Sequence, residues 1–366
     1  MVILAIFVAV IFSVVVVVAI VSARKAGNKA EPAADQEVER IQAPQRTRSP
    51  RPSRSSNRSS NGQGQQAVSL PLDATVTFAD ERRSAGVDKI LDALDDDLIG
   101  LVPVKKKVQE VAALLLVDRA RNKFGLEAPR PNLHMCFTGP PGTGKTTVAL
   151  RMADLLHRLG YLEQGQLVHA MRDDLVGEYI GQTAPKTKRT LDRAMGGLLF
   201  IDEAYYLYRD SDSKDYGQEA IEILVQVMEN NRDQLVVILA GYKDRMDHFF
   251  GSIPGMSSRI AHHLDFAPYE VGELTDIARL MLKQTSYYLS EEAEKAFHQY
   301  ITRQMDQPRF ANARSVRNEL ERARLRHAHR LTSDPGRNWT RDDLMRIEPV
   351  DIYRGHDDWL TEPQQL

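Results

Sequence analysis

A glycine-rich loop directly after an apolar segment limits the folds open to this chain more than any other sequence feature. Residues 139–146 read Gly-Pro-Pro-Gly-Thr-Gly-Lys-Thr, after the strand-like segment 133–138 and before a helical pattern of apolar residues. In such a loop the glycines let backbone N–H groups turn toward phosphates, and the following helix adds the positive end of its dipole. We therefore predict an ATP site formed by Gly139, Pro140, Pro141, Gly142, Thr143, Gly144, Lys145, Thr146 and Thr147.

Two side chains of the loop and two carboxylates farther along the chain indicate the chemistry. The Lys145 ammonium neutralises the β- and γ-phosphates, which makes it a catalytic candidate, and the Thr146 hydroxyl reaches Mg²⁺. The apolar run 198–201 has the length of a buried parallel strand, and Asp202 and Glu203 follow it. Because these carboxylates emerge beside the phosphates, we predict that Asp202 holds Mg²⁺ through water and that Glu203 orients and polarises the attacking water.

Strand-like and helical segments alternate through the central part of the chain. This alternation predicts an α/β fold with a parallel sheet covered by helices on both faces. We expect order to begin near Gly86, where apolar residues fall at helical spacing, followed by a long helix through residues 108–117. The expected strands are 133–138, 166–170, 198–201, 235–240 and 260–266.

Composition excludes several classes of protein. Of the 366 residues, 42% are apolar and 27% are charged, as in ordinary globular proteins, so a collagen-like or wholly disordered chain is excluded. The 48 Lys and Arg nearly balance the 50 Asp and Glu, so we expect no nucleic-acid partner. The single cysteine, Cys136, cannot form an intrachain disulfide.

The N-terminal part of the chain differs from the rest. Residues 1–22 are almost wholly apolar and just long enough to span a bilayer core, and Arg24 and Lys25 follow. The stretch 24–66 is rich in Arg and Ser and is expected to be disordered. One interpretation is a two-part presequence that is removed on the way to the plastid stroma. The other is a membrane anchor, which would be the chain's only contact with a membrane.

Further motifs resemble those of the AAA+ ATPases, ring-forming motors in which a P-loop α/β domain is followed by a small all-α lid. The resemblance covers residues 94–331. It implies that Ile99 and Gly100 cup the adenine base. Arg259 resembles the arginine finger, which reaches the γ-phosphate of a neighbouring subunit, and Arg314 resembles the second sensor, which reads the same phosphate in its own subunit.

One position departs from the pattern of this family. The segment 235–240 ends in Gly241 and Tyr242, where many AAA+ proteins have a polar first-sensor residue such as Asn. The sequence therefore does not identify the residue that positions the attacking water on this side of the site.

Closer matches indicate the CbbX family, the red-type Rubisco activases, which this chain resembles in segments 173–183, 201–205, 240–242 and 312–317. The resemblance implies a hexamer, of one chain or mixed with a paralogue, that draws in part of the Rubisco large subunit and releases inhibitory sugar phosphates. Because ribulose 1,5-bisphosphate regulates this family, Arg317 is a candidate for binding that effector.

Two other functions fit parts of the sequence. The first is a general AAA+ unfoldase or a secretion- or sporulation-type ATPase, tethered to a membrane or not, that acts on another client. The second is an assembly switch that binds ATP without turning it over. Glu203 argues against the switch, since a switch has no need of a water-activating carboxylate.

A candidate substrate-gripping loop lies in residues 176–181 and is bounded by glycines. In a ring it would line the central pore, where Tyr179 would offer an aromatic face to an extended peptide and Ile180 and Gly181 would follow it. The alternative is that Tyr179 packs on the core of its own domain. Residues 208–217 are a weaker candidate for a second pore loop.

These interpretations divide the chain into segments. The expected segments are a signal or anchor at 1–23, a disordered linker or transit segment at 24–66, a lead-in with a first helix at 67–93, an ATPase domain at 94–268, a helical lid at 269–345 and a tail at 346–366.

Overall fold

The computed structural model describes residues 70–71, 73–126, 129–209 and 216–352. The chain divides into two units, and the first, residues 1–64, lies wholly outside the described residues. The predicted signal or anchor segment, the whole of the predicted disordered linker and residues 353–366 of the predicted tail lie outside them as well. In the part that the structure describes, no helix is both long and apolar enough to cross a membrane.

The core of the second unit is a parallel sheet of five strands with the order β2-β3-β4-β1-β5, as the alternating pattern predicted. The strands are β1 (Met135–Thr138), β2 (Leu167–Ala170), β3 (Leu198–Ile201), β4 (Val236–Gly241) and β5 (His262–Asp265). Thr138 pairs with Gly241 on one side and with Asp265 on the other. Because the strands are parallel, their carboxyl ends meet at one edge of the sheet.

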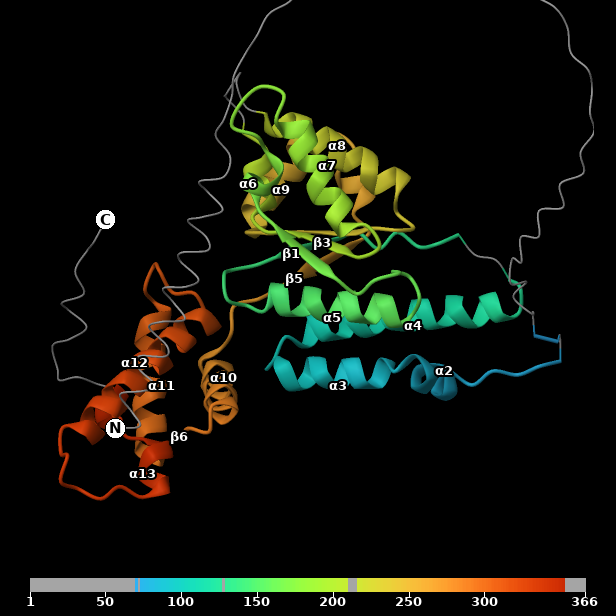
Figure 1. Ribbon diagram of the computed structural model, residues 1–366. Coiled ribbons are helices and arrows are strands. Elements are labelled where there is room, and N and C mark those ends of the chain that lie inside the picture. The colour runs from blue at the N-terminus through green and yellow to red at the C-terminus, as the bar shows by residue number, and fades with distance from the viewer. Residues whose placement is uncertain (1–69, 72, 127–128, 210–215, 353–366) are drawn as a thin grey trace, which may run out of the picture. The chain divides into compact units, whose positions relative to one another are not determined.

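Helices cover both faces of the sheet (Figure 1). One face packs on α4 (Val102–Lys123) and α5 (Lys145–Arg158), and α3 (Val87–Asp97) packs on these two helices. The other face packs on α7 (Thr183–Ala194), α8 (Gly217–Asn230) and α9 (Lys243–Ser252). Successive strand residues alternate between the two layers: Phe137 and Phe200 belong to the first hydrophobic cluster, and Cys136 and Leu199 to the second. Burial raises the pKa of the Cys136 thiol to about 12, so this thiol is chemically inert.

A helical lid follows the sheet domain. It contains α10 (Val271–Gln284), α11 (Glu291–Met305), α12 (Ala313–Thr332), α13 (Arg341–Met345) and α14 (Pro349–Ile352), and the short strands β6 (Tyr288–Leu289) and β7 (Arg346–Ile347) pair in parallel. Part of the basic face of α12 is structural. Arg330 forms two hydrogen bonds, of 2.9 and 2.7 Å, with the buried Asp351 carboxylate, and Arg326 donates to buried Glu319 at 2.9 Å.

The expectation that order begins near Gly86 is wrong, because helix α2 (Phe78–Ala85) precedes it. The Thr77 hydroxyl caps this helix by accepting from the Asp80 N–H at 3.3 Å. Glu81, only 5% exposed, pairs with Lys123 of α4. Because an ion pair and not a stripe of apolar residues fixes α2, the search for apolar spacing missed it.

A buried histidine joins the sheet to the layer that contains α8. The His134 ring donates from Nε2 to the Met228 carbonyl at 2.9 Å, and its Nδ1 accepts from the Val237 N–H at 3.0 Å. The bond that Nδ1 accepts requires the neutral ring, and burial lowers the pKa of His134.

Acid should therefore lower the free energy of unfolding. The unfolded chain protonates His134 near its ordinary pKa of about 6.5, whereas the folded chain protonates it only at lower pH. The contribution of His134 to the free energy of unfolding is therefore fully present above about pH 6.5 and is lost as the pH falls toward the lower pKa of the folded chain. The slope for one such group reaches about 1.4 kcal/mol per pH unit. Urea unfolding at a series of pH values from 7.5 to 5 measures it.

The variant His134→Asn is the matched comparison, since its amide oxygen can still accept from the Val237 N–H. It should be less stable than the native chain at pH 7.5 and should show a shallower dependence on pH. His262, whose pKa burial also lowers, is present in both chains and cancels in the comparison. Equal slopes in the two chains would show that His134 does not control the acid response.

Candidate nucleotide site

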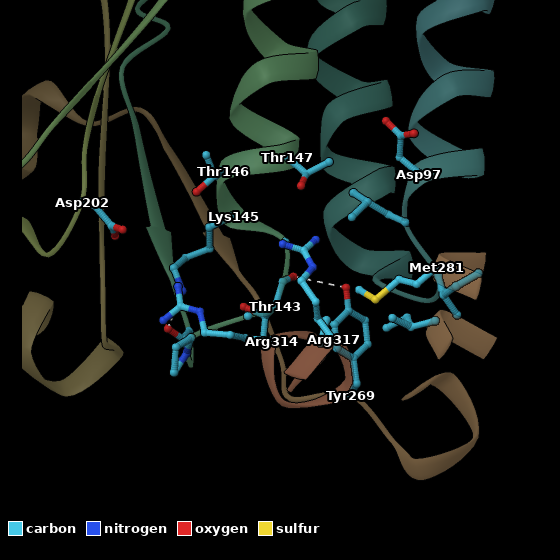
Figure 2. Close-up of a pocket in the computed structure, with 18 of the residues that line it drawn as sticks. Asp97, Thr143, Lys145, Thr146, Thr147, Asp202, Tyr269, Met281, Arg314 and Arg317 are labelled. Atoms are coloured by element: carbon cyan, nitrogen blue, oxygen red, sulfur yellow. Dashed lines mark hydrogen bonds between the residues drawn. The ribbon is translucent and has the colours of Figure 1, made fainter. Parts of the chain in front are cut away.

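A pocket of about 440 Å³ lies at the carboxyl ends of the strands, between the sheet domain and the lid. Figure 2 shows its residues in order, from Asp202 on one side, past Lys145 and the two arginines, to Asp97 and Met281 on the other. The structure brings together most of the residues that the sequence predicted for an ATP site. Those that line the pocket are Ile99, Gly139, Pro141, Gly142, Thr143, Gly144, Lys145, Thr146, Thr147, Asp202, Glu203, Arg314 and Arg317.

The glycine-rich loop follows β1 and leads into α5, which begins at Lys145. Gly142 and Gly144 have φ values of +74° and +94°, a conformation that glycine adopts without strain. The Lys145 ammonium donates to the carbonyls of Gly139 and Pro140, each at 2.8 Å. Pro140 does not itself line the pocket, and its carbonyl also accepts from the Thr143 hydroxyl at 2.8 Å.

Charges of both signs surround the centre of the pocket. Burial lowers the pKa of Lys145, the Asp202 carboxylate opposes this shift, and Arg314 adds to it. Figure 2 shows the Arg314 side chain directed toward Lys145. Two cations that point into one partly buried space destabilise each other unless an anion lies between them, so this end of the pocket suits a polyanion such as a triphosphate.

The two carboxylates follow β3. Asp202 Oδ1 accepts from the N–H of Glu203 at 3.1 Å, and Asp202 Oδ2 lies 3.8 Å from His169 Nε2. Glu203 has a φ of +50°, a strained conformation for a residue with a side chain. The described residues contain no cluster of three His, Cys, Asp or Glu for a resident metal. The Thr146 hydroxyl and the Asp202 carboxylate are hard oxygen donors, which suit Mg²⁺ bound together with phosphates.

The structure explains why glycine stands at position 241, where a polar residue was expected at the end of this strand. A Cβ at Gly241 would lie 2.8 and 2.9 Å from two ring carbons of Tyr205, so the tyrosine ring occupies the space of a side chain there. Arg245 holds Tyr205 from the other side, by a 3.4 Å hydrogen bond to the hydroxyl and by its position 5.0 Å from the ring centre. Burial and hydrogen bonding to Glu203 raise the pKa of the Tyr205 hydroxyl.

The far end of the pocket is apolar and combines the start of the domain with the lid. Ile99 lines this end, whereas Gly100 does not. Gly100 instead packs closely against α10, where a Cβ at this position would overlap the Glu273 carboxylate. Sequence reasoning missed the residues of α10 that line this end, although their helical spacing marks them as one face. They are Ile277, Leu280, Met281 and Gln284. The apolar side chains at this end suit a nucleotide base.

Besides Gly100 and Pro140, four predicted residues do not line the pocket, and they belong to other parts of the sheet domain. Arg259 follows α9 and is turned onto its own subunit, where its Nη1 donates to the Gly255 carbonyl at 2.8 Å and its Nε lies 3.3 Å from Glu229 Oε2. Tyr179 and Ile180 lie between α6 (Arg172–Leu175) and α7, and they are 67% and 84% exposed, so the alternative in which Tyr179 packs on its own core is wrong. Gly181 follows them with a φ of +81°.

The candidate second pore loop cannot be placed in the same way, because its central residues 210–215 lie outside the described residues.

Comparison with known families agrees with the fold and the pocket. Residues 135–267 match the family model described as "ATPase family associated with various cellular activities (AAA)", and residues 270–362 match "AAA lid domain". Together they define a AAA+ ATPase, an enzyme that binds and hydrolyses ATP. Among solved structures, a RuvB mutant from Thermotoga maritima aligns with 68% of this chain and 69% of its own, at 20% identity and a TM-score of 0.44.

Relatives with known names are much closer in sequence. The chromosomal protein CbxX of Cupriavidus necator is 62% identical over 270 residues, which is 74% of this chain and 84% of that protein. The chloroplastic ribulose bisphosphate carboxylase/oxygenase activase of Cyanidioschyzon merolae is 58% identical over 280 residues, 76% of this chain and 96% of that protein. A CfxQ homologue of Cyanidium caldarium is 58% identical over 279 residues, 76% and 98% of the two chains. This chain belongs to the CbbX family of AAA+ ATPases, the red-type Rubisco activases.

The close contact between the loop and the lid can be tested with a pair of glycine variants. A Cβ at Gly142 would lie 2.1 Å from the Ala311 carbonyl oxygen, whereas a Cβ at Gly160, where φ is +80°, meets nothing within 4 Å. Gly160→Ala should cost about 1 kcal/mol of stability from backbone strain alone. Gly142→Ala should in addition push the loop from the lid and weaken ATP binding by about tenfold or more.

Titration with a fluorescent ATP analogue, together with thermal unfolding, separates the two effects. Equal ATP affinity in the two variants would mean that nucleotide binding does not need the close approach of loop and lid.

Proposed function

We propose that this chain is the motor subunit of a plastid ring that hydrolyses ATP with Mg²⁺ to pull on the Rubisco large subunit and release inhibitory sugar phosphates. The observation that carries the motor part is the convergence of Lys145, Asp202, Glu203 and Arg314 on one pocket between a P-loop domain and its lid. The client comes from the relatives, one of which is named as a Rubisco activase. The plastid location rests on that chloroplastic relative and on the proposed presequence.

Each group in the pocket has a proposed task. Lys145 and the loop N–H groups bind the phosphates, and Thr146 and Asp202 hold the Mg²⁺, which neutralises phosphate charge when it is bound. Glu203 accepts a proton from the attacking water, and Tyr205 keeps its carboxylate turned toward the pocket. Arg314, at the phosphate end, contacts the γ-phosphate in its own subunit.

A neighbouring subunit completes the proposed site. Arg259 lies outside its own pocket, as an arginine that acts in trans must, and it would have to leave Glu229 and the Gly255 carbonyl to reach a neighbour's phosphate. An arginine finger contributes on the order of 10³ to 10⁵ in rate, so an isolated subunit should hydrolyse ATP slowly. We propose a hexamer, formed by this chain alone or with a paralogue.

The exposed loop of Tyr179, Ile180 and Gly181 is the proposed grip on the client. Two large apolar side chains that are more than half exposed cost free energy in a monomer, and contact with an extended peptide recovers it. The Thr183 hydroxyl accepts from the Gly177 N–H at 3.0 Å and fixes the base of this loop at the start of α7.

Ribulose 1,5-bisphosphate is the proposed effector, by analogy with the family. Arg317 lines the nucleotide pocket itself (Figure 2). This position favours contact with the nucleotide over a separate sugar-phosphate site.

The deciding experiment measures ATP hydrolysis by the full chain, with and without ribulose 1,5-bisphosphate, and the recovery of carboxylation by inhibited red-type Rubisco. ATP-dependent recovery is expected. Tyr179→Ala should abolish recovery while basal hydrolysis survives, because the loop grips the client and takes no part in the chemistry. Glu203→Gln should bind ATP normally and lower hydrolysis by at least about 10², the contribution of a general base.

The other outcomes point elsewhere. Robust hydrolysis without any sugar-phosphate response or recovery would favour a general unfoldase or secretion-type ATPase. Loss of hydrolysis in a ring that demonstrably forms would end the motor hypothesis.

The role of Tyr205 can be tested with a neighbouring control. Arg245 donates to the hydroxyls of both Tyr205 and Tyr206, but of these two only Tyr205 has a pKa that the Glu203 carboxylate raises. Tyr205→Phe should lower kcat of ATP hydrolysis by about tenfold with KM for ATP unchanged, because the carboxylate loses a positioning bond worth about 1 kcal/mol or slightly more. Tyr206→Phe should leave kcat near that of the native chain, and equal losses in both variants would refute the assignment.

A further inference from the structure

Asn312, the residue just before α12, has a backbone conformation that residues other than glycine rarely adopt. Its φ is +48° and its ψ is −128°. Such a conformation persists only where surrounding contacts require it. Because glycine would adopt it without strain, the asparagine at this position points to a use for its side chain.

The Asn312 side chain is buried, and both ends of its amide are hydrogen-bonded. Oδ1 accepts from the backbone N–H of Tyr269 at 3.1 Å, and Nδ2 donates to the carbonyl of Pro141 at 3.2 Å. Tyr269 belongs to the linker between β5 and α10, and Pro141 belongs to the phosphate-binding loop. One side chain therefore joins the loop, the linker and the start of a lid helix.

Five consecutive carbonyl groups of the loop, from residue 139 to residue 143, accept hydrogen bonds from this protein. The Lys145 ammonium donates to the first two. The lid and the linker hold the other three, and Figure 2 marks the last of them with a dashed line. These three pairs are Pro141 O with Asn312 Nδ2 at 3.2 Å, Gly142 O with the Ala313 N–H at 3.2 Å, and Thr143 O with the Tyr269 hydroxyl at 3.3 Å.

This arrangement sets the direction of the loop N–H groups. A planar peptide whose carbonyl is fixed on one side presents the N–H of the next residue on the other side. Within the described residues, no acceptor is paired with the N–H of Gly142, Thr143 or Gly144. Unpaired N–H groups in succession form a concave site for anions. The donors on the lid side therefore orient the loop for phosphate.

We infer that Asn312 is a positioning residue for nucleotide binding, which fixes the phosphate-binding loop and the lid helix that carries Arg314 in one relative position. The inference rests on the proposed nucleotide site. A swing of the lid away from the sheet domain would break the bonds to Pro141 and Gly142 together. Nucleotide affinity and lid position are then coupled, and each changes the other by the same free energy.

The test measures the dissociation constants of ADP and ATP, and the thermal midpoint without nucleotide, for the full chain. Asn312→Gly removes both amide bonds and relieves the backbone strain. It should weaken binding of both nucleotides by about tenfold while the midpoint stays close to that of the native chain. The control is Ser286→Gly, which relieves a similar positive φ, 59°, at an exposed turn of the lid and should leave affinity unchanged.

A double-mutant cycle with Arg314→Ala separates positioning from a general structural effect. If Asn312 positions the helix of Arg314, the loss of ATP affinity caused by Arg314→Ala should be several-fold smaller in the Asn312→Gly background than in the native one. Two losses that simply multiply would overturn the inference, as would unchanged affinity in Asn312→Gly.

A second variant decides the question if Asn312→Gly does not fold. Tyr269→Phe deletes only the donor to the Thr143 carbonyl, and it should weaken ADP binding several-fold without change of fold. Unchanged affinity in Tyr269→Phe would mean that the donors on the lid side do not set the phosphate affinity of the loop, and it would overturn the inference. A native chain that binds neither nucleotide would instead overturn the proposed nucleotide site itself.

Discussion

The nucleotide pocket depends on one constraint, the common orientation of the peptide groups in the loop between β1 and α5. Five consecutive carbonyls accept hydrogen bonds, two from Lys145 and three from the linker and lid. Glycine at 142 and 144 permits the positive φ values that this orientation requires. The loop therefore gains its shape from contacts on both of its sides as well as from its own sequence.

The sheet places the other groups within reach of this loop. Residues of β1, β3 and β4 alternate between two hydrophobic clusters, so the strands are fixed in register from both faces. Because Thr138 pairs with Gly241, and Ile201 with Leu239, the ends of the three central strands meet beside the loop. The Tyr205 ring fills the space beside Gly241, at the end of β4, and the hydroxyl of the same tyrosine interacts with Glu203. One residue thus accounts for the glycine at position 241 and supplies a polar neighbour for Glu203.

Local pattern was enough to predict the loop and β3 with its two carboxylates, because each is encoded in a few consecutive residues. The parallel sheet followed from the alternation of strand-like and helical segments, and the helical lid from the resemblance to the AAA+ family. The residues that sequence reasoning missed act across long separations. Asn312 bonds to Pro141, 171 positions away, and Tyr269 to Thr143, 126 away, and neither has a local signal of that contact. Helix α2 was missed because Glu81 pairs with Lys123, a contact that apolar spacing cannot reveal.

The pocket takes its two ends from different parts of the chain, and we propose that ATP moves the lid through this division. In the proposed cycle the base lies against α10, and the γ-phosphate lies between Lys145 of the sheet domain and Arg314 of the lid. Cleavage and release of that phosphate removes one of the anions between these two cations, while the β-phosphate stays at Lys145 and the base stays bound. Repulsion between Lys145 and Arg314 then favours a small opening of the lid at the phosphate end. The three lid-side hydrogen bonds of the loop oppose this opening, so their strength sets how readily the lid moves.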